Sequence, residues 1–244
     1  MTVVPTEIPT GGAVDTLEVR WIVAGPLVTE VRQWFGRFPT GTEVREDAYL
    51  SLPRLPGLSV KLRDRVSLDV KSYLGCPGVI ARLDSCRGRL EYWRKRSFRC
   101  EPVDEGHVLP PGWTKVSKRR LRTWFPLPAR EAPAGSLVVA EAGCAVELVQ
   151  AQLRGEPWWS VGFEATGPLG LLRGALEHAV DIMFARSPPA GVEFSLDTSK
   201  SYAEWLTQQP HPDAGQSMKD ELPCPVDRPC GPPAALYLGT IPPG

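Results

Sequence analysis

Lysine and arginine side chains recur along one face of a stretch with the pattern of two short β-strands. In residues 58–75, Lys61, Arg63 and Lys71 alternate with apolar residues, and alternation with a period of two is typical of strands. Guanidinium and ammonium groups bind phosphate oxygens well. If these ionic faces point into a shared interior, they form a site for a polyanion. On an open antiparallel sheet, the same faces would simply be solvated.

Carboxylates occur in the same alternating pattern. Glu18, Glu91 and Glu164 each lie on the polar face of a predicted strand. Carboxylate oxygens are ligands that Mg²⁺ and Mn²⁺ prefer. Carboxylates also neutralise cations, and many unpaired cations in a low-dielectric interior would cost more free energy than folding supplies. We therefore expect these carboxylates either to hold a divalent metal or to form salt bridges with the cations.

Eight alternating segments must position these side chains. Apolar residues at spacings of three and four predict helices after the first and the last of the eight strands, and a third, short helix follows. The fold class is therefore predicted as α+β: an antiparallel eight-stranded tunnel-like β-barrel with flanking helices. The predicted strands are 16–23, 43–52, two within 58–75, 87–99, 115–125, 144–153 and 158–166, and the predicted helices are 28–38, 169–186 and 199–208. A glycine-containing loop is expected between residues 75 and 87.

The apolar face of each strand is expected to lie outward beneath the helices, which turns the ionic face inward. An eight-stranded barrel has an interior just wide enough for one small ligand. The interior is predicted to collect the side chains of Glu18, Arg20, Arg45, Asp47, Lys61, Arg63, Asp69, Lys71, Arg89, Glu91, Lys95, Lys118, Arg120, Arg122 and Glu164.

From Thr16 to Arg186 the chain resembles the CYTH superfamily, the triphosphate tunnel metalloenzymes, as a divergent member. The order and spacing of several short segments carry the resemblance. These segments are LEVRWI, EDAYLSLP, LSVKLRD, SLDVKSYLG, GRLEYW, KRRLRTWF and WWSVGFEATG. The resemblance implies a tunnel barrel that binds triphosphates and, in most members, cleaves them with a divalent metal.

Roles for individual residues follow from this resemblance. We expect Glu18, Glu164 and Lys71 to be catalytic. Glu18, Glu91 and Glu164 are the expected ligands of Mg²⁺ or Mn²⁺. The expected phosphate-binding residues are Arg20, Arg45, Lys61, Arg63, Lys71, Arg89, Lys95, Lys118 and Arg120.

Two strands depart from the pattern of the superfamily. Its first strand opens with Glu-x-Glu-x-Lys, whereas this chain has Thr16, Glu18 and Arg20 in the same register. Its closing strand offers two carboxylates two positions apart, whereas this chain has Gly162 and Glu164. A metal that activates water must be fixed by its ligands, so losing carboxylates weakens the case for hydrolysis more than the case for anion binding.

Three functions are therefore considered. The first is binding and metal-dependent hydrolysis of a triphosphate-bearing small molecule, such as inorganic triphosphate, thiamine triphosphate or a nucleotide. The alternative is a catalytically degenerate protein that binds phosphate or nucleotide on the same fold without hydrolysis. The third is a protein-binding or RNA-binding module that uses Arg94, Arg96 and Arg119 on an exposed face.

The charge distribution favours a local anion site. The 244 residues include 28 Lys or Arg and 28 Asp or Glu, so the overall charge gives no sign of a nucleic-acid or membrane partner. Between Arg87 and Trp124, however, eleven Lys or Arg stand against four Asp or Glu. This local excess of seven positive charges favours a small-molecule polyphosphate or nucleotide as the partner.

The sequence predicts a cytoplasmic protein, as a monomer or homodimer. No apolar run approaches the roughly 18 residues of a membrane span, and the N-terminus lacks the pattern of a secretory signal. The six cysteines have no CxxC spacing, which favours reduced thiols over zinc ligands. We expect a flexible segment at 1–14, a barrel domain at 15–208 and a Pro/Gly-rich disordered tail at 209–244.

Overall fold

The computed structural model describes residues 12–82, 86–100, 110–128, 142–185 and 188–209. Most of the predicted N-terminal segment and nearly all of the predicted tail lie outside these residues, so the division into domains stays a prediction. The four cysteines in the described part of the chain form no disulfide. None of the helices described has the length and apolar character needed to cross a bilayer.

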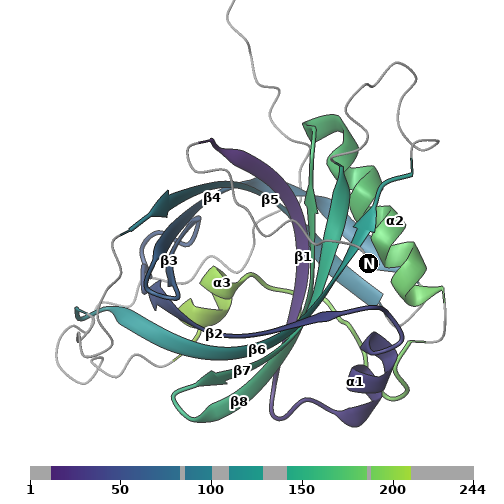
Figure 1. Cartoon of the computed structure of the whole chain (residues 1–244), viewed down its shortest axis with the longest axis horizontal. Helices are drawn as coiled ribbons and strands as arrows, with labels where there is room; N and C mark the ends of the chain where they lie inside the picture. Colours follow the sequence, from purple (N-terminus) through teal and green to yellow (C-terminus); the bar gives the residue numbers. More distant parts are fainter. Residues whose placement is uncertain (1–11, 83–85, 101–109, 129–141, 186–187, 210–244) are drawn as a thin grey trace, which may run out of the picture.

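Eight antiparallel strands close into a barrel, as the alternation predicts (Figure 1). The order around the barrel is β1-β5-β4-β3-β2-β6-β7-β8. The strands are β1 (Val14–Ala24), β2 (Gly41–Leu50), β3 (Leu58–Arg63), β4 (Ser67–Arg82), β5 (Cys86–Arg99), β6 (Trp113–Pro126), β7 (Gly143–Leu153) and β8 (Glu156–Thr166). The helices are α1 (Thr29–Phe35), α2 (Leu172–Phe184) and α3 (Tyr202–Thr207), with a 3₁₀ turn at Leu169–Leu171 before α2. The predicted fold class is confirmed.

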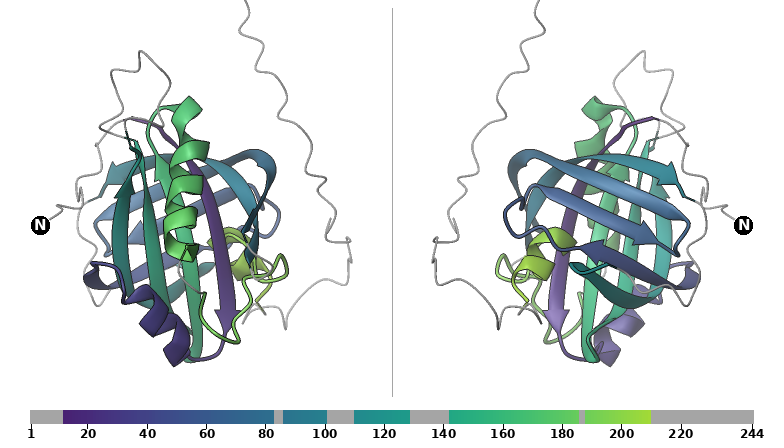
Figure 2. Two further views of the ribbon diagram at one scale, coloured as in Figure 1. Left: turned by 90° about the vertical axis from the view of Figure 1, so that its right-hand side faces the viewer. Right: turned by 90° about the vertical axis from the view of Figure 1, so that its left-hand side faces the viewer.

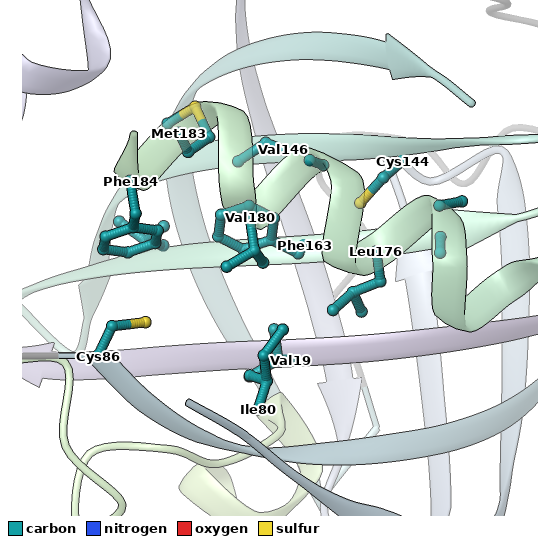
Figure 3. Packing of buried hydrophobic residues seen from close by; sticks show 14 of the residues in the cluster. Val19, Ile80, Cys86, Cys144, Val146, Phe163, Leu176, Val180, Met183 and Phe184 are labelled. Carbon is teal, nitrogen blue, oxygen red and sulfur yellow. The ribbon is translucent and has the colours of Figure 1, made fainter. Parts of the chain in front are cut away.

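The main hydrophobic core lies outside the barrel wall. Figure 2 shows α2 lying across the outer face of the strands β7, β8 and β1. Val19 of β1 and Phe163 of β8 point outward and pack beneath Leu176 and Val180 of α2 (Figure 3). All four side chains are essentially inaccessible to solvent. Because this core takes up the apolar faces, the opposite faces of these strands are left to line the interior.

The loop predicted between residues 75 and 87 is wrong. β4 continues through this region to Arg82 and pairs with β5. The register shifts on either side of Gly75, which has φ +146°, and Gly78 has φ +127°. Gly75 and Gly78 adopt positive φ angles, which favour glycine, and form two β-bulges. The bulges bend the strand but do not end its pairing with β5. They also break the period-two pattern, which is why the sequence suggested a loop.

The segment that follows α2 fills a gap in the barrel wall. β1 pairs with β5 only as far as Glu18, beyond which the two strands diverge. Residues 194–200 lie in this gap: the backbone N–H of Ile22 donates to the carbonyl oxygen of Thr198, and that of Arg87 donates to the carbonyl oxygen of Phe194. The segment leads into α3, whose N-cap is Ser201: its hydroxyl accepts from the backbone N–H of Glu204.

A substitution at Gly88 can test how tightly the barrel wall packs against the outer hydrophobic core. A Cβ added at Gly88 would lie 2.5 Å from Cγ2 of Val19 and 2.6 Å from Cζ2 of Trp21. We expect Gly88→Ala to lower the free energy of unfolding by about 1–3 kcal/mol, because the buried neighbours must shift. Urea denaturation measures this. Gly41→Ala in β2 is the matched control, since its added Cβ has no atom within 4 Å; equal losses in both variants would contradict the packing.

Candidate functional site

A cavity of about 490 Å³ occupies the interior of the barrel. All eight strands contribute to its lining, as do Ser201, Tyr202 and Ala203 of the C-terminal segment. Eleven of the side chains predicted to form the site line this one cavity. They are Glu18, Arg20, Arg45, Lys61, Arg63, Lys71, Glu91, Lys95, Lys118, Arg120 and Glu164.

Cations outnumber carboxylates in the cavity wall. Among the described residues that line it, nine are Lys or Arg and six are Asp or Glu. Asp47, which is buried in the wall and pairs with three of these cations, is a seventh carboxylate, so the excess is two positive charges. The cations come from six different strands and converge because each occupies an inward position of its strand. The cavity is therefore an anion-attracting interior.

Lys71 holds two of the predicted catalytic carboxylates together. Its Nζ lies 2.5 Å from Oε1 of Glu18 and 3.2 Å from Oε2 of Glu164. Glu18 and Glu164 are direct cross-strand partners on β1 and β8. Burial alone would lower the pKa of Lys71, but the charges of Glu164 and Glu18 outweigh it and raise the pKa. Lys71 therefore stays protonated, and the pKa of Glu164 is held well below its usual range despite burial.

A second cluster surrounds Asp47, whose side chain is fully buried. Nζ of Lys118 lies 2.9 Å from Oδ2 of Asp47, and Nη2 of Arg45 lies 3.3 Å from the same oxygen. Lys118 also donates to the hydroxyl of Tyr49 at 2.5 Å. Burial would raise the pKa of Asp47, yet the surrounding cations, Lys118 first, lower it. Asp47 is therefore a structural anion that keeps Lys118 and Arg45 in the interior.

A third cluster is centred on Asp69 of β4. Nη2 of Arg63 lies 2.5 Å from Oδ2 of Asp69, while the Nζ atoms of Lys61 and Lys95 lie 3.5 and 3.7 Å from it. The single carboxylate of Asp69 is thus shared by three cations, so it neutralises only part of their charge. Burial lowers the pKa of Lys61 and of Lys95, and their carboxylate neighbours offset this only in part. A further anion near these two lysines would offset the cost of burying their charge.

Glu147 of β7 is a site residue that the sequence analysis did not select. It lies between two guanidinium groups, with Arg20 at 2.7 Å and Arg120 at 3.0 Å. Its strand is almost continuously apolar, so the alternation that identified the other inward residues is absent there. A lone acidic residue in such a strand was the available signal. Tyr202, which stacks on Tyr49 at the end of the cavity, had no such signal.

Arg89 is the predicted phosphate-binding residue that does not line the cavity. Its Nη2 donates to Oε2 of Glu204 at 2.6 Å and to the carbonyl oxygen of Ser199 at 3.0 Å. Arg89 therefore ties α3 to the barrel. As a result, α3 closes one end of the lumen, where it is seen in Figure 1.

Several guanidinium nitrogens of the cavity have no hydrogen-bond partner among the described residues although they are buried. They are Nη1 of Arg20 and the Nε atoms of Arg45, Arg63 and Arg120. A buried donor without an acceptor costs free energy. These four nitrogens therefore carry a cost of burial that no acceptor among the described residues offsets.

The carboxylates expected to hold Mg²⁺ or Mn²⁺ do not fit that role in this arrangement. Glu91 and Glu164 both flank Glu18 in the strand register. The ammonium group of Lys71, however, lies between Glu18 and Glu164, in the space that a shared cation would need. In the part of the chain that the structure describes, no group of three or more His, Cys, Asp or Glu side chains is placed to hold a metal.

Glu91 gives a pH-dependent prediction. Burial, aided by the charge of Glu18, raises its pKa from 4.5 to about 7, against the hydrogen bond from Nε1 of Trp93. A raised pKa stabilises the folded state at low pH, and this contribution is lost as pH rises through about 7. Glu91→Gln is therefore expected to gain about 1–3 kcal/mol in unfolding free energy, relative to wild type, between about pH 5 and pH 8. Chemical denaturation at several pH values measures this difference.

The control for this measurement is Glu156→Gln, because Glu156 is exposed on β8. Glu156→Gln is expected to change the free energy of unfolding by less than about 0.5 kcal/mol, as substitutions at exposed positions usually do. A Glu91→Gln variant that tracks wild type at every pH would contradict a buried, mostly neutral Glu91.

No protein-family model and no curated protein matches this chain. Solved structures with a similar fold include a conserved hypothetical protein of Pyrococcus furiosus, at 15% identity and a TM-score of 0.40 over 77% of this chain and 98% of that one. The RNA triphosphatase Pct1 of S. pombe, in complex with the Spt5 CTD, matches at 8% identity and a TM-score of 0.36, over 73% and 82% of the two chains.

A Mimivirus capping enzyme triphosphatase matches at 7% identity and a TM-score of 0.36, over 69% of this chain and 89% of that one. Similarity at this level carries no information on activity, so the function has to be inferred from the lumen itself. The closed eight-stranded barrel and its charged interior are the features expected from the resemblance to the CYTH superfamily in sequence.

Proposed function

We propose that the chain binds a triphosphate- or polyphosphate-bearing small molecule in the lumen of its barrel. The observation that supports this best is the convergence of nine Lys and Arg side chains, from six strands, on one cavity. Such a gathering of charge is costly in a folded protein unless something negative balances it. The carboxylates in the wall balance only part of it, and a polyanion supplies the rest.

The chemistry of the wall suits phosphate in particular. Guanidinium groups present several N–H donors in a fixed plane, and ammonium groups act as compact point charges, so the two together can surround the oxygens of a phosphate chain. A single ligand fills an interior of this size.

The two ends of the lumen differ. At one end, α3 places Tyr202 on the ring of Tyr49, with centroids 5.6 Å apart. The opposite end is lined by Val14, Trp124 and Thr166. The phosphate chain of the ligand would lie among the cations. The rest of the ligand, to which the phosphate chain is attached, would lie toward Trp124. We take the protein to act in the cytoplasm, where such ligands are found.

Hydrolysis of the bound ligand with Mg²⁺ or Mn²⁺ is a second candidate function. It is favoured by the register, which makes Glu91, Glu18 and Glu164 neighbours on adjacent strands. Release of phosphate from tripolyphosphate, with either metal present, separates hydrolysis from binding alone. The position of the Lys71 ammonium group favours binding alone.

Lys95 and Arg96 provide a matched test, because they are adjacent on β5 and face opposite sides of the wall. Lys95 lines the cavity, whereas Arg96 is exposed. We expect Lys95→Met to weaken tripolyphosphate binding by about tenfold or more, the usual effect of losing a hydrogen bond to a charged group. Arg96→Met is expected to change the affinity less than about twofold, since an exposed charge is screened.

Isothermal titration calorimetry at fixed ionic strength measures both affinities, and circular dichroism checks that both variants are folded. Equal weakening in the two variants would place the anion outside the barrel. If Lys95→Met does not change the affinity for tripolyphosphate, the lumen is not the binding site.

A further inference from the structure

We infer that Lys71 takes the place of a divalent cation in this lumen, so that the chain binds a triphosphate without metal. The inference rests on the proposed function and states what that binding requires. Lys71 extends from β4, which is separated from β1 by β5. Its ammonium group reaches past β5 and contacts carboxylates on both β1 and β8.

The contacts of Lys71 are those that a bridging cation would make. Its Nζ lies 2.5 Å from Glu18 and 3.2 Å from Glu164, and the two carboxylates come from directly paired positions. Mg²⁺ requires a near-octahedral set of oxygens at about 2.0–2.1 Å. It cannot approach both carboxylates while the ammonium group lies between them. One positive charge is thus already supplied where two negative charges face each other.

Two carboxylate oxygens of the site also accept hydrogen bonds from other protein donors. Oε1 of Glu18 accepts a hydrogen bond from the hydroxyl of Thr16 at 2.6 Å in addition to that from Lys71. Oε2 of Glu91 accepts from Nε1 of Trp93 at 3.0 Å. A metal would have to compete with these donors for its ligands.

A second protein cation, the guanidinium group of Arg20 on β1, packs against β8. This observation does not depend on the position of Lys71. The guanidinium group of Arg20 lies over Gly162: a Cβ added there would be 2.6 Å from its Cζ and Nη1. Arg20 is held in this place by Glu147 at 2.7 Å. The missing side chain at position 162 is therefore space that Arg20 uses, and it leaves no room for a further carboxylate on β8.

Lys71 can serve the ligand directly as well. An ammonium group has three N–H donors. Two of them are directed to Glu18 and Glu164, which leaves the third for a phosphate oxygen. A metal bridging these carboxylates would contact the phosphate from the same position. The lysine thus performs the electrostatic part of a metal's role but supplies no metal-bound water.

The first arm of the test compares tripolyphosphate binding to the wild-type chain in EDTA and in Mg²⁺. We expect binding in EDTA to be at least as tight as in Mg²⁺, because Mg²⁺ neutralises the free ligand. Binding that needs Mg²⁺ would overturn the inference while leaving the proposed function intact. Absence of binding in both conditions would instead remove the proposed function.

The second arm uses Mn²⁺ alone, followed by its electron paramagnetic resonance signal. Wild type is expected to bind no Mn²⁺ at millimolar concentration, whereas Lys71→Met, which frees Glu18 and Glu164, is expected to bind it. Lys61→Met is the matched control, because Lys61 lines the same cavity but pairs with Asp47 and Asp69. It is expected to remain without Mn²⁺.

The affinity of the Lys71→Met variant for tripolyphosphate, measured with and without Mn²⁺, gives a further test. Lys71→Met is expected to lose at least about tenfold in affinity in EDTA and to regain it when Mn²⁺ is added. Mn²⁺ bound by wild type, or an affinity of Lys71→Met that Mn²⁺ does not change, would overturn the inference. The wild-type Mn²⁺ titration decides the matter even if Lys71→Met does not fold.

Discussion

The barrel depends on how negative and positive charges are balanced in its interior. Asp47, Asp69 and Glu147 each contact two or three cations, and all three are buried or nearly so. Burying a charge without a partner costs several kcal/mol. The carboxylates therefore make it possible to gather so many cations at all, yet they stop short of neutralising them. The surplus, rather than any single residue, is what makes the lumen a site for an anion.

A charged interior is possible because the apolar residues pack elsewhere. In most small barrels side chains fill the interior as a core. Here the core lies between α2 and the outer faces of β1, β7 and β8. The segment that follows α2 then fills the gap between β1 and β5 and brings α3 to the end of the lumen. Stability and ligand binding are thus placed on opposite sides of the same strands.

Much of this arrangement could be predicted from period-two alternation, because a strand's two faces are set by residue parity alone. That reasoning placed Lys61, Lys71 and Glu164 in the lumen. It failed where the determining contact is distant in sequence: Arg89 pairs with Glu204, which lies 115 residues away. It failed also where Gly75 and Gly78 interrupt the alternation of β4. From the sequence, Gly162 could be recognised only as the position of a missing carboxylate. The three-dimensional structure shows that the guanidinium group of Arg20 occupies that space.

The most direct test of a cationic lumen that binds polyphosphate is a crystal structure of the chain grown with tripolyphosphate in EDTA. The charge distribution predicts phosphate density inside the barrel, in contact with Lys61, Arg63 and Lys71, with no metal beside it. Phosphate density on the outer face, near Arg96 or Arg119, with only water in the lumen, would contradict it.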